Sequence, residues 1–303
     1  MGTTSRVPVV STSLVSGQLL ILGGGFGLYG YVPAAIQTSW QVTTLSRYKG
    51  LLENRTELSG LLNQVDFISE TDLDPQFYDA IVIARTPRQQ FDFVQANPTF
   101  QGHYFLEKPL GDTEESTLQL LDTLQSRKSS FSVAYLFEYQ EWYKHLASGE
   151  NLGTDVAIDW RISSPKNRSW KESPDAGGGI LAYYGVHLLS LIVDCAYDLR
   201  NLEISHQTDL LEIKLKNSSR EISLKLSVGQ ISSFEVVLKG RNGVYHWSRE
   251  TPFGVIPTPG IPDPRIPALI EYLSGWSKHK SLSEFVTKER KILELRQTIS
   301  AIL

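Results

Sequence analysis

The chain has 303 residues, of which 41% are hydrophobic and 20% are charged, and its formal net charge is −4 at pH 7. This balance is ordinary for a globular protein of two domains, and the lack of a basic run argues against a nucleic-acid partner. No apolar run is long enough for a membrane-spanning helix, so no membrane partner is expected. The single cysteine, Cys195, excludes an internal disulfide and a cysteine-cluster metal site, and its apolar neighbours indicate a core residue.

Residues 1–17 differ from the rest of the chain. They are rich in Ser, Thr and Val, and they lack the basic start and the apolar stretch of a signal peptide. We interpret them as a flexible N-terminal tail and expect the protein to be cytoplasmic.

The first half of the chain alternates between two kinds of segment. Strand candidates lie at 18–22, 41–46, 65–68, 79–84, 103–106 and 131–136. Segments with helical spacing lie between most of them, at 48–63, 88–95 and 113–126. The stretch Asp112-Thr113-Glu114-Glu115 is typical of a helix start. This alternation predicts a doubly wound parallel sheet in residues 18–136, with ligands at the carboxyl ends of its strands.

The pattern changes in residues 137–303. A turn at 149–153 precedes residues 155–162, which alternate with the period of a strand, and a meander of alternating segments fills 201–248. An apolar run of helix length covers 180–193, a proline-rich surface segment covers 252–266, and helices are expected near 266–277 and 287–302. We therefore predict an α+β domain with an open, mostly antiparallel sheet, whose C-terminal helix can pack back on the first domain.

A glycine motif follows the first predicted strand. Gly25-Phe26-Gly27-Leu28-Tyr29-Gly30 stands between that strand and residues 31–36, which can open a helix with Pro33 in its first turn. This context is typical of a dinucleotide-binding turn, in which Gly25 permits the tight turn, Gly27 lets the pyrophosphate approach, and Gly30 lets helix and strand pack closely. The preceding Gly23-Gly24 leaves the register of the motif open.

Further polar residues follow the other strands of the first half. Ser46-Arg47 ends the second strand, where an acid would favour NAD, and a hydroxyl beside a guanidinium suits the 2′-phosphate of NADP. The alternative for Arg47 is a solvated surface residue. Thr86-Pro87 and Glu107-Lys108 follow the fourth and fifth strands. From these motifs we expect coenzyme contacts from Gly25, Phe26, Gly27, Leu28, Tyr29, Ser46, Arg47, Thr86, Pro87, Glu107 and Lys108.

Three residues are candidates for catalysis. Lys108, at the end of the fifth strand, could stabilise charge on a substrate oxygen. Tyr183 and His187 are four residues apart on the predicted helix, so a phenol and an imidazole share one face and can exchange a proton with substrate. For His187 the alternative is a hydrogen-bonded core histidine.

Taken together, these motifs resemble the glucose–fructose oxidoreductase / inositol dehydrogenase (Gfo/Idh/MocA) family. The resemblance covers nearly the whole chain from about residue 18. It rests on Gly25-x-Gly27-x-x-Gly30 with Pro33-Ala34-Ala35, on Thr86-Pro87, on Glu107-Lys108-Pro109, and on Gly178-Gly179-x-Leu181-x-x-x-Gly185-x-His187. It implies a Rossmann domain over 18–136 and a substrate and dimerisation domain over 137–303.

The resemblance also implies roles for single residues. Lys108 would contact substrate and nicotinamide, and His187 would lie on the substrate side. Many members have an aspartate where this chain has Tyr183, and a histidine common after the Thr-Pro loop is Gln90 here. Some relatives that resemble dihydrodiol dehydrogenase or glucose–fructose oxidoreductase use a tyrosine as the acid, so Tyr183 is expected to be the proton donor.

The function implied is NADP-dependent hydride transfer to or from a sugar, polyol or similar small molecule, with NAD as the alternative coenzyme and no metal. We expect Trp160, Arg161, Asn167 and Trp170 to contact the substrate. Two alternatives stay open: a non-catalytic NADP-binding sensor, and a reductase of a dicarbonyl, dihydrodiol or tetrapyrrole. Because relatives often associate through the open sheet, a homodimer is expected.

Overall fold

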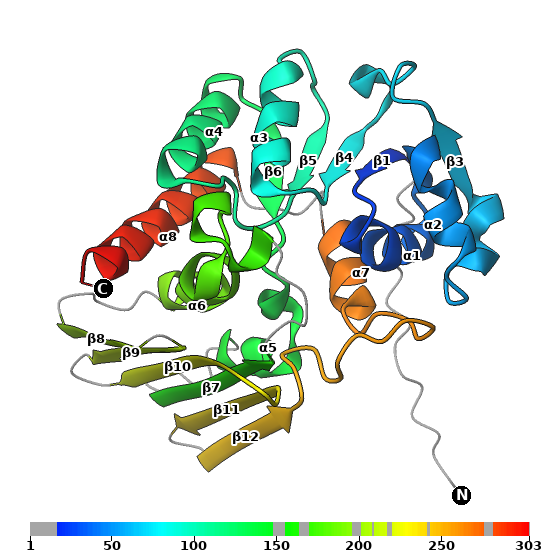
Figure 1. Ribbon diagram of the computed structural model, residues 1–303. Helices are drawn as coiled ribbons and strands as arrows, with labels where there is room; N and C mark the ends of the chain where they lie inside the picture. Colours follow the sequence, from blue (N-terminus) through cyan, green and yellow to red (C-terminus); the bar gives the residue numbers. More distant parts are fainter. Residues whose placement is uncertain are drawn as a thin grey trace, which may run out of the picture.

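The computed structural model describes residues 17–147, 155–163, 170–195, 201–207, 209–216, 220–240, 243–275 and 281–302 (Figure 1). The predicted tail up to residue 16, the predicted turn at 149–153 and the candidate substrate residue Asn167 lie outside the described residues. Among the described residues, the structure has no helix that combines the length and the apolar character needed to cross a membrane.

The first sheet is parallel throughout, as predicted. Its six strands are β1 (Gln18–Leu22), β2 (Gln41–Leu45), β3 (Val65–Ile68), β4 (Ala80–Ile83), β5 (His103–Leu106) and β6 (Ser130–Val133). They lie in the order β3-β2-β1-β4-β5-β6. The order reverses between β1 and β4, and in open parallel sheets the crevice at such a reversal is the place where ligands bind.

Helices cover both faces of this sheet, which explains why the central strands β1 and β4 are apolar at nearly every position. The helices on one face include α1 (Val32–Gln37) and α7 (Ile266–Ser274), and those on the other include α3 (Pro87–Ala96) and α4 (Glu114–Ser126). In β1, Leu19 and Ile21 pack with α1 and α7, and Leu20 and Leu22 belong to the core on the opposite face.

The second sheet is mixed and mostly antiparallel, as predicted. Its strands are β7 (Asp155–Ser163), β8 (Leu202–Gln207), β9 (Leu210–Lys216), β10 (Glu221–Gly229), β11 (Ser233–Gly240) and β12 (Gly243–Arg249). Their order is β12-β11-β7-β10-β9-β8, and only the central pair of β7 and β10 is parallel among the described pairings.

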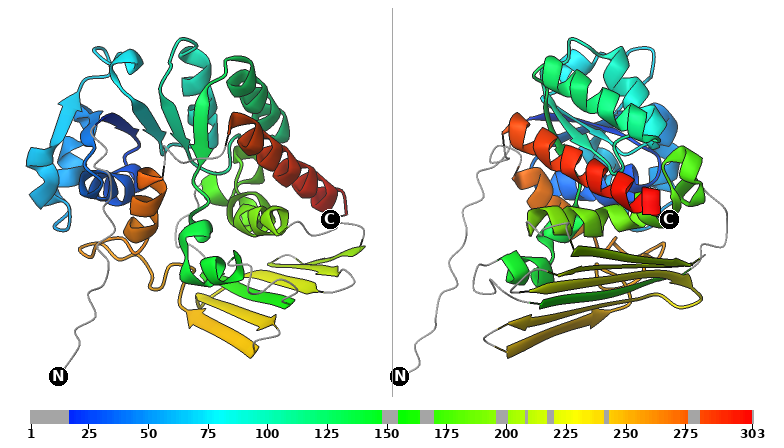
Figure 2. Two further views of the ribbon diagram at one scale, coloured as in Figure 1. Left: turned by 180° about the vertical axis from the view of Figure 1, so that it is seen from behind. Right: turned by 90° about the vertical axis from the view of Figure 1, so that its left-hand side faces the viewer.

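The two faces of the second sheet differ. One face packs against α6 (Val186–Asp194), with side chains such as Trp160, Leu226 and Phe234 in the core. The opposite face carries charged residues, for example Lys225 beside Glu212. Figure 2 shows this face open along its length.

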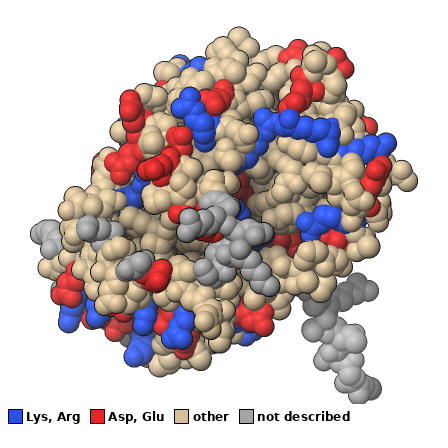
Figure 3. All heavy atoms as spheres, viewed as in Figure 1, with Lys and Arg blue, Asp and Glu red and all other residues tan. Residues whose placement is uncertain are grey.

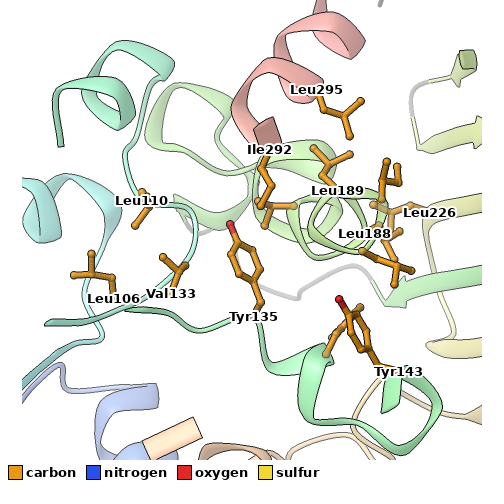
Figure 4. Packing of buried hydrophobic residues seen from close by; sticks show 14 of the residues in the cluster. Leu106, Leu110, Val133, Tyr135, Tyr143, Leu188, Leu189, Leu226, Ile292 and Leu295 are labelled. Atoms are coloured by element: carbon orange, nitrogen blue, oxygen red, sulfur yellow. The ribbon is translucent and has the colours of Figure 1, made fainter. Parts of the chain in front are cut away.

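The last helices return to the first sheet. Helix α7 lies against α1, and α8 (Leu282–Ile302) contacts α4, β6 and α6 (Figure 2). Figure 4 shows the layer between the two sheets, where Tyr135 projects from the end of β6 toward α8 and where Ile292 and Leu295 face Leu189. The C-terminal helices thereby tie both sheets into one packed body.

Several predicted boundaries differ from the structure. The segment 48–63 forms only α2 (Lys49–Glu53) and, further on, a 3₁₀ turn over Ser59–Gln64. Helix α8 begins five residues earlier than expected, because Ser281 and Glu284 exchange backbone and side-chain hydrogen bonds that cap it. Other short elements include α5 (Glu141–Ala147) and a wide π-helical turn over Ile180–Gly185 that runs directly into α6.

Candidate functional site

A cavity of about 350 Å³ opens at the carboxyl ends of the strands of the first sheet. Figure 3 shows this face hollowed between the upper and lower parts of the molecule, with basic side chains above the hollow. The cavity is lined by Gly23, Gly24, Gly25, Phe26, Tyr29, Arg47, Tyr48, Ala84, Arg85, Thr86, Gln89, Glu107, Lys108, Ala134, Leu136, Trp170, Lys171, Tyr183, His187, Phe253 and Arg265. It therefore joins residues from five strand ends to residues of the second half of the chain.

The glycine turn after β1 has a different register from the predicted one. Gly23 has φ +151°, and a Cβ there would lie 2.2 Å from the carbonyl oxygen of Ala84, so Gly23 makes the tight turn. Gly25 lies on the cavity wall, and a Cβ there would meet nothing within 4 Å, so this backbone is open to a ligand. Helical backbone begins at Gly27, as a π-helical turn over Gly27–Tyr31 that precedes α1.

The other two glycines of the motif have packing roles, as we expected for Gly30 and in place of the pyrophosphate contact that we expected for Gly27. A Cβ on Gly27 would touch Ala84 and Ile21 at 3.4 Å, and one on Gly30 would lie 2.3 Å from the ring of Phe26. Leu28 is buried in the core between the sheet and α1. Gly27 and Leu28 are therefore not on the cavity wall, whereas Phe26 and Tyr29 are.

The outer end of the cavity holds two guanidinium groups. Arg47 and Arg85 both reach Glu70, with Nη–Oε1 distances of 2.9 and 3.8 Å, and Arg47 also donates to the hydroxyl of Tyr48 at 3.0 Å. Both arginines line the cavity, but Ser46 is exposed and does not. Arg85 was not predicted from the sequence, although its place just after the buried strand β4 is a positional signal for this edge of the sheet.

Helix α3 begins at the cavity wall. Thr86 caps it by a reciprocal pair of hydrogen bonds with Gln89. Pro87 is the first helical residue and faces Gly177, so, contrary to our expectation, it is not on the wall.

Gln90 on α3 fixes the loop that carries Lys108. Its side-chain amide donates to the carbonyl oxygens of Glu107 and Leu110, at 2.9 and 3.1 Å, and its Oε1 accepts the backbone N–H of Glu107 at 2.8 Å. Gln90, which the motif resemblance compared with a histidine, is therefore a buried residue that holds this loop in place. The peptide bond from Lys108 to Pro109 is cis.

Lys108 and Glu107 point into the inner end of the cavity. Lys108 Nζ donates to the carbonyl oxygen of Tyr183 at 2.9 Å and lies 3.7 Å from the centroid of the Tyr183 ring. The side-chain carboxyl of Glu107 accepts a hydrogen bond of 2.7 Å from the hydroxyl of Tyr31. Burial lowers the pKa of Lys108 and raises the pKa of Glu107, because both charged forms lose water.

Tyr183 and His187 both reach this inner end from one helical run. Burial raises the pKa of Tyr183, which keeps its phenol protonated. The ring of His187 stacks on Phe137, with centroids 4.4 Å apart and planes 11° apart. Burial, with the charges of Lys108 and Arg265, lowers the pKa of His187, and its Nδ1 has no hydrogen-bond partner among the described residues. The imidazole is therefore neutral.

Arg265 was not expected from the sequence. It comes from the proline-rich segment just before α7, and its guanidinium lies 3.9 Å above the ring of Phe26. Asp263 holds it through two side-chain hydrogen bonds of 2.8 Å, Nε to Oδ1 and Nη2 to Oδ2. Burial alone would lower the pKa of Arg265, but Asp263 raises it, so the guanidinium stays charged.

The four candidate substrate residues differ in whether they lie on the cavity wall. Trp170 lines the cavity and meets the ring of Tyr183 edge-on, at 5.3 Å between centroids. Trp160 is buried in the core beneath His187, and Arg161 lies on the opposite, exposed face of β7, so neither reaches the cavity. Asn167 lies outside the described residues. Lys171 and Phe253, which were not predicted, also line the cavity.

Comparisons with known proteins agree with this architecture. No protein-family model and no curated protein sequence matches the chain. Among solved structures, it is similar to a Gfo/Idh/MocA family oxidoreductase from Vibrio cholerae, with a TM-score of 0.69, 13% identity, and coverage of 94% of this chain and 98% of that one. The WlbA (WbpB) dehydrogenase from Thermus thermophilus, in complex with NAD and UDP-GlcNAcA, has a TM-score of 0.64 and 15% identity, with 93% and 94% covered. KijD10, a 3-ketoreductase from Actinomadura kijaniata in complex with NADP and TDP-benzene, has a TM-score of 0.65 and 10% identity, with 94% and 97% covered.

These likenesses extend over both sheets and over nearly the full length of each chain. The chain therefore has the fold of the Gfo/Idh/MocA-type dehydrogenases. This is the fold that the motif resemblance implied.

Proposed function

We propose that the protein is an NADP-dependent oxidoreductase that acts on a carbonyl or alcohol carbon of a sugar-like substrate. The observation that carries the proposal is that Lys108, Tyr183 and His187 line the same cavity as the glycine turn. Two separate parts of the chain thus supply a dinucleotide-type turn and three groups suited to proton and charge control. The fold shared with dehydrogenases supports the proposal by analogy.

The residues present fit a nicotinamide dinucleotide. The wall at Gly25 is backbone without a side chain, and a helical turn begins two residues later, which is the arrangement that accepts a pyrophosphate. When bound, the coenzyme supplies or accepts a hydride at its nicotinamide ring. The protein then has to hold the substrate carbon beside that ring and to control the proton on the substrate oxygen.

Lys108 and Tyr183 would handle the substrate oxygen. The ammonium of Lys108 is fixed by the carbonyl oxygen of Tyr183, so it is oriented before the substrate arrives. In reduction, Tyr183 would donate the proton that turns the developing alkoxide into an alcohol, and in oxidation it would accept that proton. His187 is neutral and stacked on Phe137, which suits it to orient a substrate hydroxyl.

Arg47 and Arg85 favour NADP over NAD. Both line the outer end of the cavity near the end of β2, where the adenosine ribose of a bound dinucleotide is expected. Guanidinium groups bind a phosphate through paired N–H groups. Glu70 lies between them, and we propose that the 2′-phosphate replaces this carboxylate as their partner.

The test is a coenzyme titration followed by a substrate screen. Quenching of protein fluorescence by NADPH and NADH gives both affinities, and loss of reduced-nicotinamide absorbance with keto-sugars gives turnover. We expect tighter binding of NADPH and turnover of at least one keto-sugar. NADPH binding without turnover on sugars, dicarbonyls or dihydrodiols would instead favour a sensor, and no binding of either coenzyme would refute the proposal.

A further inference from the structure

The guanidinium of Arg265 is only partly satisfied by the protein. Of its five N–H groups, two are donated to Asp263, each at 2.8 Å. The other three, on Nη1 and the far side of Nη2, have no acceptor among the described residues. Nε and one N–H of Nη2 face Asp263. The second N–H of Nη2 and the neighbouring N–H of Nη1 therefore form a second fork, of the kind that binds carboxylate or phosphate bidentately.

The position of this fork is fixed before any ligand binds. The backbone N–H of Arg265 also donates to Asp263, at 2.9 Å, and that residue is buried at the start of α7. The flat face of the guanidinium rests on Phe26, 3.9 Å from the ring centroid. A charged group that is held on one edge and one face has little side-chain entropy left to lose on binding.

Arg265 belongs to the inner end of the cavity, where the candidate catalytic residues lie. Its guanidinium lies over the rings of Phe26 and Tyr29, 3.9 and 5.8 Å from their centroids, on the cavity wall that Lys108, Tyr183 and His187 complete. Lys171 lines the same end, with its ammonium 5.2 Å from the Tyr183 ring centroid. By contrast, Arg47 and Arg85 lie at the outer end, toward β2 and β4.

Carboxylates, which commonly accept hydrogen bonds from sugar hydroxyls, are scarce here. Among the described residues that line the cavity, Glu107 is the one carboxylate, and it already accepts a hydrogen bond from the hydroxyl of Tyr31. A neutral polyol needs several acceptors for its hydroxyl protons, whereas a cationic fork needs an oxyanion. The inner end is therefore better matched to an anionic substrate than to a neutral polyol.

We infer that Arg265 binds an oxyanion group of the substrate, a carboxylate or a phosphate, and selects anionic sugar-like molecules over neutral ones. This inference rests on the proposed function and names the substrate class for the same site. Arg265 acts as a specificity residue that places the reactive carbon relative to Lys108 and Tyr183. It lies far along the chain from both, in the segment that returns from the second sheet to α7.

The experiment measures ligand binding to the full chain loaded with NADP. The probes are matched sets: glucose with glucuronate and glucose 6-phosphate, and galactose with galacturonate and galactose 6-phosphate. The affinity of each probe is measured from the shift in the thermal unfolding midpoint, and from the change in the fluorescence of bound NADPH when the probe is added to the protein loaded with NADPH. We expect a uronate or a sugar phosphate to bind at least about tenfold more tightly than its neutral parent, as a charged hydrogen-bonded pair predicts. The carboxylate and phosphate arms distinguish the two sources of the oxyanion.

Substitutions assign the effect to Arg265. In Arg265→Gln the preference for the anionic probe should disappear, while the affinity for NADPH stays within about twofold. Arg265→Lys should keep only part of the preference for the anionic probe, because an ammonium group carries the charge but not the paired N–H groups. The double variant Asp263→Asn with Arg265→Gln leaves no unpaired buried carboxylate, so it covers the case in which Arg265→Gln fails to fold. Arg290→Gln, on the exposed face of α8, is the matched control.

Two results would overturn the inference. One is equal binding of anionic and neutral probes by the wild-type protein. The other is a loss of NADPH affinity in Arg265→Gln as large as the loss of probe affinity, which would make Arg265 a coenzyme ligand. A wild-type protein that binds neither NADPH nor NADH would refute the proposed function instead, so the two failures are distinguishable.

Discussion

Lys108 contacts Tyr183 twice: its Nζ donates to the Tyr183 carbonyl oxygen at 2.9 Å and also lies 3.7 Å from the centroid of the same residue's ring. The lysine comes from the end of a strand of the first sheet, and the tyrosine comes from the helical run that covers the second. One ammonium group therefore orients a phenol and joins the two sheets at the cavity. Each of the two residues can be tested separately.

Removal of the ammonium should slow the chemistry and spare coenzyme binding. In Lys108→Met we expect kcat to fall by about a hundredfold or more, because a buried cation no longer stabilises charge on the substrate oxygen. Stopped-flow absorbance of the reduced nicotinamide measures the rate, and fluorescence titration measures NADPH affinity. Lys214→Met, on the exposed face of β9, is the control. An unchanged rate in Lys108→Met would remove this lysine from the mechanism.

The phenol of Tyr183 should matter more than its ring. Tyr183→Phe keeps the carbonyl oxygen and the aromatic face that hold Lys108, so the cavity is preserved. We expect kcat to fall by roughly a hundredfold, in the range for loss of a general acid, with little change in KM. Tyr184→Phe, next in the chain and outside the cavity wall, is the matched control. If both variants were equally active, the proton would come from another group.

Coenzyme choice should depend on Glu70 as well as on Arg47. Arg47→Ala removes one guanidinium, so NADPH affinity should fall by about tenfold while NADH affinity changes little. Glu70→Gln removes the carboxylate that now pairs with Arg47 and Arg85, so NADPH should bind more tightly. Fluorescence titrations with both coenzymes measure the four affinities. A parallel shift for NADPH and NADH in either variant would exclude contact with the 2′-phosphate.

Alanine substitutions at the two glycines of the turn should have different effects, one on stability and the other on coenzyme affinity. Gly23→Ala places a Cβ 2.2 Å from the carbonyl oxygen of Ala84 at φ +151°, so we expect a loss of more than about 2 kcal/mol in the free energy of unfolding. Gly25→Ala places a Cβ in open space, so stability should be kept and NADPH binding weakened. Urea unfolding and coenzyme titration distinguish these outcomes. Equal stability of the two variants would contradict the register described above.

A buried carboxyl on α8 should make stability depend on pH. The carboxyl of Glu289 accepts a hydrogen bond of 2.9 Å from the hydroxyl of Tyr135. Burial raises the pKa of this carboxyl to about 7. Between the ordinary carboxyl pKa and about 7, the folded protein binds a proton that the unfolded chain has lost, so this contribution to stability falls as pH rises.

Glu289→Gln removes that titration. Relative to wild type, the variant should gain stability from pH 5 to pH 8, by up to about 3 kcal/mol from the size of the pKa shift. Urea unfolding at several pH values measures the difference. Glu294→Gln, on the exposed side of the same helix, should show no such trend. A pH-independent difference for Glu289→Gln would mean that the carboxyl ionises normally in the folded protein.

The sequence alone determined the layout of the first sheet and predicted that a cavity would open at the carboxyl ends of its strands. Strands buried on both faces are mostly apolar, as β1 and β4 are, so they stand out between amphipathic helices. The capping residues Thr86 and Thr113 mark two helix starts by local hydrogen bonds. Lys108 was likewise located from its position directly after β5. These features depend on residues that are near one another in the chain, which is why periodicity and spacing reveal them.

Only the tertiary structure decided which side chains meet in the cavity. Alternation along β7 separates Trp160 from Arg161, but it does not reveal that one is buried under His187 and the other is exposed. The role of Gly23 depends on Ala84, and the place of Arg265 depends on the return of α7 to α1. Such contacts join residues far apart in the sequence, and long-range packing selects them through burial and shape, which local patterns do not encode.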